Sequence, residues 1–177
     1  KNFNLIPSEI EKAITQKTKA IIPVHLYGQC APMEEIMTIA NKNNLYVIED
    51  TAQALGANYL FSDGSIQKAG TIGTIGTTSF FPSKNLGCFG DGGAIFTKNS
   101  FLAEKIKMIC NHGSKQKYNH EIIGVNSRLD SIQAAILRIK LKRLKQYSSS
   151  RYEAASLYSS ELKNISWLET PHEESYT

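Results

Sequence analysis

The sequence predicts an α/β fold, in which helices alternate with parallel strands. An apolar segment at 19–26 and another at 45–49 are separated by a stretch with helical periodicity. A β-α-β unit of this kind makes its two strands parallel and its crossover right-handed. Two segments rich in β-branched and aromatic residues, at 77–81 and 93–97, are expected as later strands. The 177 residues suffice for one core and a piece of a second domain.

The first half of the chain contains elements that frame these strands. Ser8 is expected to cap a short helix over 7–14. Pro32 suits the first turn of a helix that extends to Asn41, because the apolar residues between them follow the helical spacing. The segment 58–74 is rich in Gly, Ser and Asp, which predicts a hairpin or an irregular excursion.

The second half is expected to be mainly helical. A cap at Asn99 and an amphipathic pattern predict a helix that ends at Cys110, and the polar, aromatic segment 111–125 is expected to be a loop. The elements expected after this loop are a long helix from Leu129 to Leu144, a break at 148–150, a helix over 152–162 and an extended segment at 167–171.

Composition and charge exclude several classes of protein. Hydrophobic residues make up 41% and charged residues 20%, which is typical of a globular domain and not of a disordered or fibrous chain. There is no apolar stretch of membrane-spanning length and no signal-peptide pattern, so a cytoplasmic protein without a membrane partner is expected. The net charge is +4, but the basic run 138–145 alternates with apolar residues. We interpret this run as a solvated helix face and not as a nucleic-acid site.

Cysteine and histidine spacing gives no metal site. Cys30, Cys88 and Cys110 are odd in number and lack a Cys-x-x-Cys pair, so neither a disulfide framework nor a zinc site is expected. The histidines at 25, 112 and 120 are not at ligand spacing. They are therefore interpreted as hydrogen-bonded structural or loop residues.

A lysine and an acid follow two of the predicted strands. Lys84 lies just after the strand at 77–81, and the glycine-rich segment 87–93 keeps the following backbone compact. Asp50 ends the strand that begins at Leu45. This pair suits pyridoxal phosphate (PLP), whose aldehyde forms a Schiff base with lysine and whose ring nitrogen stays protonated beside a carboxylate.

Six separate stretches carry a resemblance to a known family. They are Pro23-Val-His-Leu-Tyr-Gly-Gln29, Val47-Ile-Glu-Asp-Thr-Ala-Gln-Ala-Leu-Gly-Ala57, Ser79-Phe-Phe-Pro-Ser-Lys-Asn-Leu-Gly87, Gly90-Asp-Gly-Gly93, Asn111-His-Gly113 and Gly124-Val-Asn-Ser-Arg-Leu-Asp-Ser-Ile-Gln-Ala-Ala135. In this order and spacing, the sequence resembles the DegT/DnrJ/EryC1 sugar aminotransferases, which are fold-type I PLP enzymes.

The resemblance implies a three-layer αβα large domain of the aspartate aminotransferase type and the start of a small C-terminal domain. The implied division is 1–127 for part of the PLP-binding large domain, 128–147 for a connecting helix and 148–177 for the beginning of the small domain. The family's upstream Gly-Thr phosphate-binding segment and its fuller small domain have no counterpart in this sequence. The chain is therefore expected to be the central part of a family member.

The resemblance also implies roles for individual residues. Lys84 would be the Schiff-base lysine and Asp50 the partner of the ring nitrogen. Ala52 would lie against the ring, and Gln53 would bond the phenolic oxygen. Two further matches concern the phosphate: Ser79 takes the place of a phosphate-binding hydroxyl, and Asn126 that of an asparagine that reaches the phosphate in the other subunit of a homodimer.

The implied reaction is the transfer of an amino group, from glutamate, to a 3- or 4-keto hexose linked to a nucleotide diphosphate, in amino-sugar or cell-surface polysaccharide biosynthesis. A wall against the substrate's diphosphate or the neighbouring subunit is expected from His112, Lys115, Lys117, Tyr118 and His120. The alternatives are a cyclitol aminotransferase and a non-catalytic or regulatory domain. Lys84 favours the enzyme, because family relatives that dehydrate sugars carry histidine there.

Overall fold

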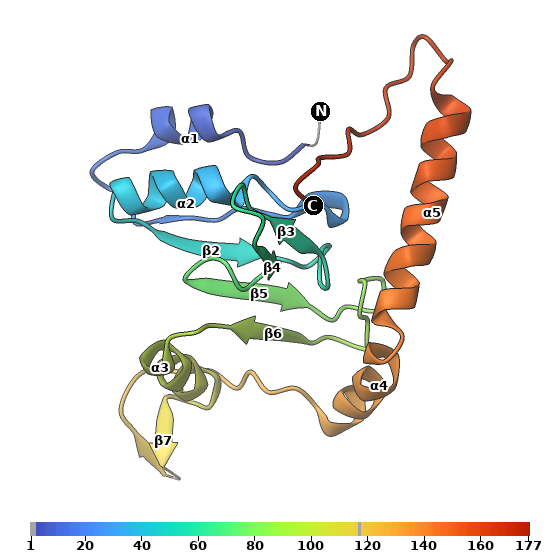
Figure 1. Ribbon diagram of the computed structural model, residues 1–177. Helices are drawn as coiled ribbons and strands as arrows, with labels where there is room; N and C mark the ends of the chain where they lie inside the picture. The colour runs from blue at the N-terminus through green and yellow to red at the C-terminus, as the bar shows by residue number, and fades with distance from the viewer. Residues whose placement is uncertain (1–2, 117) are drawn as a thin grey trace.

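The computed structural model describes residues 3–116 and 118–177, and its central element is a four-stranded sheet. The strands are β1 (Ala20–Ile21), β2 (Tyr46–Asp50), β5 (Ile75–Ser79) and β6 (Gly93–Phe96), in the order β1-β2-β5-β6. The first three are parallel, and β6 runs antiparallel to β5. Figure 1 shows β2 and β5 pointing in the same direction. The predicted α/β class and the predicted parallel pairing are confirmed.

Two helices near the N-terminus lie on the part of the sheet formed by β1 and β2. They are α1 (Pro7–Ala13) and α2 (Met33–Lys42). The buried face of α2 belongs to a core cluster with Ile21 of β1 and Val47 of β2. Ser8 does not cap α1, so that prediction was wrong: the N-cap is Ile6, without a side-chain hydrogen bond. Pro7 takes the first helical position, where its missing N–H leaves no extra donor unpaired.

The predicted strand at 19–26 is shorter than expected. After β1 the chain forms an isolated bridge between Val24 and Asp50 and then a 3₁₀ turn, η1 (Leu26–Gly28). Pro23 has no N–H to donate to a strand ladder, and Tyr27 has a left-handed backbone with φ of 57°. Both features end regular pairing.

Two hairpins lie outside the main sheet. The first, formed by β3 (Asn58–Leu60) and β4 (Ile66–Lys68), is antiparallel and confirms the hairpin expected within 58–74. The second, formed by β7 (Ser114–Gln116) and β8 (Asn119–His120), was not expected, because the segment 111–125 was interpreted as a loop. Its strands are too short, and too polar, to show an alternating pattern in the sequence.

The helices of the second half match the predictions in part. Asn99 caps α3 (Ser100–Cys110) by accepting a hydrogen bond from the N–H of Leu102 at 3.1 Å, as predicted. The break predicted at 148–150 was wrong, because α5 (Leu144–Leu162) passes through these serines. The preceding helix, α4 (Ser131–Leu141), instead ends just before Lys142. Serine is only weakly unfavourable within a helix, so three in a row do not end one.

Figure 1 shows α5 as a long helix at the side of the sheet where the loop after β5 emerges. The boundary predicted after residue 147 falls within this helix, and the division into domains stays a prediction. The chain then returns to the core, where the carbonyl of Tyr176 accepts the N–H of Leu60 at 2.8 Å. Among the described residues, none of the helices combines the length and apolar character that crossing a bilayer requires.

Candidate active site

The carboxyl ends of β2 and β5 meet at one edge of the sheet. Asp50, the last residue of β2, pairs in register with Thr77 of β5. Ser79 ends β5, and the loop that follows contains Lys84. Because parallel strands end on the same side, the acid, the hydroxyl and the loop with the lysine all lie at this edge, and α/β sheets bind ligands at such edges.

Asp50 is fixed through its backbone and through one carboxylate oxygen. Its N–H donates to the carbonyl of Pro23 at 2.9 Å, and its carbonyl accepts the N–H of His25 at 3.0 Å. Its Oδ1 accepts the N–H of Ala52 at 2.9 Å. No hydrogen bond to Oδ2 is present within the described residues. Asp50 is half-buried as a residue, and its Oδ2 is therefore available to a donor at the strand end.

The loop that carries Lys84 is compact. The N–H of Lys84 donates to the carbonyl of Phe81 at 2.9 Å, and the N–H of Cys88 donates to that of Phe80 at 2.8 Å. Gly87 packs so closely on the loop that a Cβ there would overlap the carbonyl of Pro82. Lys84 is half-buried. Its ammonium group has no hydrogen bond or ion pair among the described residues.

Helices α4 and α5 pack against this loop. Leu137 of α4 is buried in a second core cluster with Phe80, Leu86 and Cys88 of the loop. The Nζ of Lys140 donates to the carbonyl of Gly87. Lys140 thus departs from the solvated face expected of the run 138–145, whose other basic residues are exposed, as expected. No sequence pattern indicates this contact, because the partner is a backbone carbonyl.

Gln53 has a defined side-chain orientation. Its Oε1 accepts the N–H of Tyr27 at 2.8 Å. The two N–H groups on Nε2 are thereby left to donate elsewhere. Ala52, half-buried, lies between Asp50 and Gln53 in the same turn. Both residues are thus placed beside the carboxyl end of β2.

Ser79 and Asn126 do not line the same space. The Oγ of Ser79 accepts the N–H of Phe81 at 3.2 Å, so its hydroxyl hydrogen stays available to an acceptor. Asn126 is exposed and accepts a hydrogen bond from Nε of Arg128 at 2.9 Å. It lines an open hollow of about 1210 Å³ between β6, α3 and the segment before α4, whereas Ser79 does not.

The residues expected to form a substrate wall lie mostly in the β7–β8 hairpin. Nδ1 of His120 is 2.8 Å from the carbonyl oxygen of His112, and Tyr118 is 85% exposed. Lys115 forms an exposed ion pair with Glu104 of α3 at 3.3 Å. Lys117 lies outside the described residues. The hairpin thus carries Lys115, Tyr118 and His120, with His112 shortly before it, and the role of the five residues as a wall stays a prediction.

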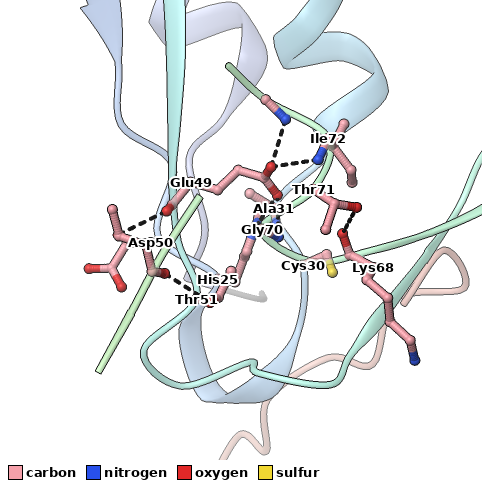
Figure 2. Close-up of polar contacts among 12 residues, drawn as sticks. His25, Cys30, Ala31, Glu49, Asp50, Thr51, Lys68, Gly70, Thr71 and Ile72 are labelled. Atoms are coloured by element: carbon pink, nitrogen blue, oxygen red, sulfur yellow. Dashed lines mark hydrogen bonds and ion pairs between the residues drawn. The ribbon is translucent and has the colours of Figure 1, made fainter. Parts of the chain in front are cut away.

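A buried polar network lies behind Asp50. His25 and Glu49 are both fully buried, and Nε2 of His25 is 3.0 Å from Oε2 of Glu49. Figure 2 shows the Glu49 side chain pointing toward the loop of Gly70 and Ile72, whereas the Asp50 carboxylate points to the other side of the strand. This follows from the alternation of side chains along β2.

Glu49 accepts three further hydrogen bonds, from backbone groups. Its Oε2 accepts the N–H of Gly70 at 2.8 Å, and its Oε1 accepts those of Ile72 at 2.7 Å and Gly73 at 2.6 Å. Burial by itself raises the pKa of Glu49, but the hydrogen bonds from His25, Gly73 and Gly70 outweigh it, so the pKa lies below its usual value. Glu49 is therefore a charged carboxylate.

The structural role expected of His25 is confirmed, but its partner Glu49 was missed. The signal in the sequence was a second acid directly before Asp50, in a strand expected to be buried. A buried carboxylate requires several donors. Within the described residues, no group of three or more His, Cys, Asp and Glu side chains is placed to hold a metal ion.

Comparison with known proteins identifies the family. A model of the DegT/DnrJ/EryC1/StrS aminotransferase family matches residues 1–176. The chain is 53% identical over 156 residues to a pleiotropic regulatory protein of Geobacillus stearothermophilus, covering 88% of this chain and 41% of that protein. It is 48% identical over 165 residues to a UDP-2-acetamido-2-deoxy-3-oxo-D-glucuronate aminotransferase of Pseudomonas aeruginosa, covering 93% of this chain and 45% of that protein.

A solved structure gives the same result for the fold. The crystal structure of NtdA from Bacillus subtilis with bound cofactor PMP superposes with a TM-score of 0.80 at 38% identity, over 97% of this chain and 39% of that one. The chain thus spans less than half the length of each of these three proteins. The resemblance and the fold type predicted from the six stretches are confirmed. This chain belongs to the DegT/DnrJ/EryC1/StrS aminotransferase family.

Proposed function

We propose that the full-length protein is a PLP-dependent aminotransferase that transfers an amino group from glutamate to a keto sugar linked to a nucleotide diphosphate. The observation that carries this proposal is the sheet edge itself. A half-buried lysine, whose amine has no partner among the described residues, lies in the loop after β5. The neighbouring strand, β2, ends in a carboxylate with one oxygen available.

The groups at this edge fit PLP by their chemistry. Lys84 supplies an amine for the aldehyde carbon, and Asp50 supplies a carboxylate for the ring nitrogen. Gln53 supplies N–H donors for the phenolic oxygen, since its carbonyl oxygen is already bonded to Tyr27. Ser79 supplies a hydroxyl donor for a phosphate oxygen. When bound, the cofactor draws electrons from the substrate carbon that loses its proton.

The chain's own residues then have distinct tasks. Lys84 would hold the cofactor covalently. Once free, its Nζ would take the proton from the α-carbon of the amino donor and pass it to the cofactor carbon to which the lysine was bound. In the second half of the reaction it would take a proton from that carbon and pass it to the sugar carbon that is aminated. The Asp50 carboxylate would accept a hydrogen bond from the protonated ring nitrogen. The compact loop and the contacts from α4 hold the lysine in place, so that its amine stays near the reacting carbon.

The keto-sugar substrate is supported by the Pseudomonas aeruginosa relative, whose name specifies a 3-oxo sugar nucleotide. The net charge of +4 is compatible with an anionic substrate. We further propose a cytoplasmic homodimer in which Asn126 reaches the phosphate bound by the other subunit. His112, Lys115, Tyr118 and His120 would then contact the diphosphate or that subunit.

A regulatory role is the second candidate, because the relative at 53% identity is named a pleiotropic regulatory protein. Amino transfer separates the two. The full-length protein, loaded with PLP and mixed with glutamate alone, should release 2-oxoglutarate in one equivalent. Lys84→Ala should abolish this release, while the exposed Lys98→Ala keeps it. If the PLP-loaded protein releases no 2-oxoglutarate, the proposal that it is an aminotransferase is rejected.

A further inference from the structure

We propose that the buried His25–Glu49 pair is a positioning element that fixes which way the Gln53 side-chain amide faces, so that Gln53 donates and does not accept at the cofactor's phenolic oxygen. It acts through the turn Leu26–Gly28, whose Tyr27 N–H binds Gln53. The inference deepens the proposed function and rests on it. The protein's residues at 25, 27 and 49 thereby gain a role in cofactor chemistry without touching the cofactor.

The tautomer of His25 is set by the hydrogen bonds of its two ring nitrogens. Nδ1 accepts the N–H of Ala31 at 3.0 Å, so it carries no hydrogen. Nε2 is therefore the protonated nitrogen and donates to Glu49. Two other titratable groups are close to Glu49: the Cys30 thiol, whose pKa is raised to about 11 chiefly by burial, and Asp50, whose carboxylate points away.

His25 holds both ends of the turn. Its backbone N–H donates to the carbonyl of Asp50 at 3.0 Å, while its ring binds Ala31 on the far side. The turn between these anchors is closed by the N–H of Gln29, which donates to the carbonyl of Leu26 at 3.1 Å. Figure 2 shows His25, Ala31 and Glu49 grouped behind the strand that ends at Asp50.

Asn4 also anchors the turn Leu26–Gly28, through its side-chain amide. Its Oδ1 accepts the N–H of Leu26 at 3.1 Å, and its Nδ2 donates to the carbonyl of Cys30 at 3.2 Å. The turn needs these anchors, because Tyr27 has a positive φ of 57°, which costs a residue with a side chain conformational energy. Loosening them lets the backbone relax and moves the Tyr27 N–H away from Gln53.

The orientation of Gln53 has a chemical consequence. A donor to the phenolic oxygen stabilises its negative charge and thereby lowers the proton affinity of the nearby nitrogen that links Lys84 to the cofactor. If the amide turns over, its carbonyl oxygen faces that negative charge instead, and the stabilisation is lost. The pH midpoint of the visible absorbance of the lysine-bound cofactor therefore reports how Gln53 faces.

The test is a double-mutant cycle on the PLP-loaded full-length protein. Gln53→Ala should raise the pH midpoint of the absorbance by about 0.5 to 1 unit, the size expected for one lost hydrogen bond. Glu49→Gln should also raise the midpoint. Whichever way the new amide turns, its NH₂ group faces two N–H donors, and this disturbs the His25–Glu49 pair that anchors the turn. In the Gln53→Ala background, Glu49→Gln should move the unfolding temperature but leave the midpoint unchanged.

Asn4→Ala gives a second route to the same result if Glu49→Gln does not fold, and the exposed His172→Gln is the control that should leave the midpoint unchanged. The inference is overturned if Glu49→Gln or Asn4→Ala leaves the midpoint at the wild-type value, or if their shifts add to that of Gln53→Ala. A wild-type protein without a Lys84-linked absorbance band would instead reject the proposed function, and the inference with it.

Discussion

Replacing Glu49 with Gln should destabilise the fold far more than the change of one atom suggests. The carboxylate accepts bonds from His25, Gly70, Ile72 and Gly73, two at each oxygen. In glutamine, one oxygen becomes an NH₂ group, which then faces two donors. Each buried donor left without an acceptor costs about 1 to 3 kcal/mol. The expected loss in the free energy of unfolding is therefore about 2 to 6 kcal/mol at neutral pH.

The loss should depend on pH with a defined sign. The pKa of Glu49 is lowered in the folded state, so its stabilisation is complete above its unfolded pKa of about 4.3 and disappears as the pH falls through the lower folded value. Glutamine does not titrate. The difference between the wild type and Glu49→Gln should therefore be constant from neutral pH to about pH 5 and shrink below about pH 4.

Urea unfolding of the full-length protein at a series of pH values measures this difference. Glu9→Gln is the matched control, because Glu9 pairs with Lys12 at 2.7 Å on the surface, where its side chain is 59% exposed. That change should cost less than about 1 kcal/mol. A loss below about 1 kcal/mol for Glu49→Gln at neutral pH, or a difference that grows as the solution is acidified, would refute the reasoning.

Three further predictions concern the loop and the thiols. Gly87→Ala should reduce borohydride-dependent labelling of Lys84, because a Cβ overlaps the Pro82 carbonyl; unchanged labelling would contradict the packing. Lys140→Met should lower the unfolding temperature through the lost bond to the loop, whereas an unchanged temperature would show that this bond is dispensable. Cys110, which is partly exposed, should be alkylated well before the buried Cys30, whose pKa is raised to about 11 by burial; mass spectrometry after a short exposure shows the order, and the reverse order would be inconsistent with the burial.

Much of the fold was predictable because it follows from local periodicity. The helix between the strands at 19–26 and 45–49 fixed the parallel pairing of β1 with β2. The features that could not be predicted depend on backbone conformation, which the sequence patterns do not indicate. The first strand ends before Pro23 and is followed by a turn with a left-handed Tyr27, and the hairpin of β7 and β8 has almost no apolar alternation.

The site was predictable to the extent that its chemistry stands out along the chain. Lys84 and Asp50 follow strands, and the structure places both at the carboxyl edge of the sheet. The network around Glu49 was not foreseen, because its donors come from residue 25 and from 70–73, far from it in sequence. Nor does the sequence reveal that the Tyr27 N–H occupies the carbonyl oxygen of Gln53.

The most direct test of the proposed function is chemical labelling of the lysine. The full-length protein is incubated with PLP, its visible spectrum is recorded before and after reduction with borohydride, and the protein is then digested and its peptides mapped. We predict that the visible band disappears on reduction and that the cofactor's mass is attached to Lys84. A label on any other residue, or no label at all, would contradict the assignment of this sheet edge as the cofactor site.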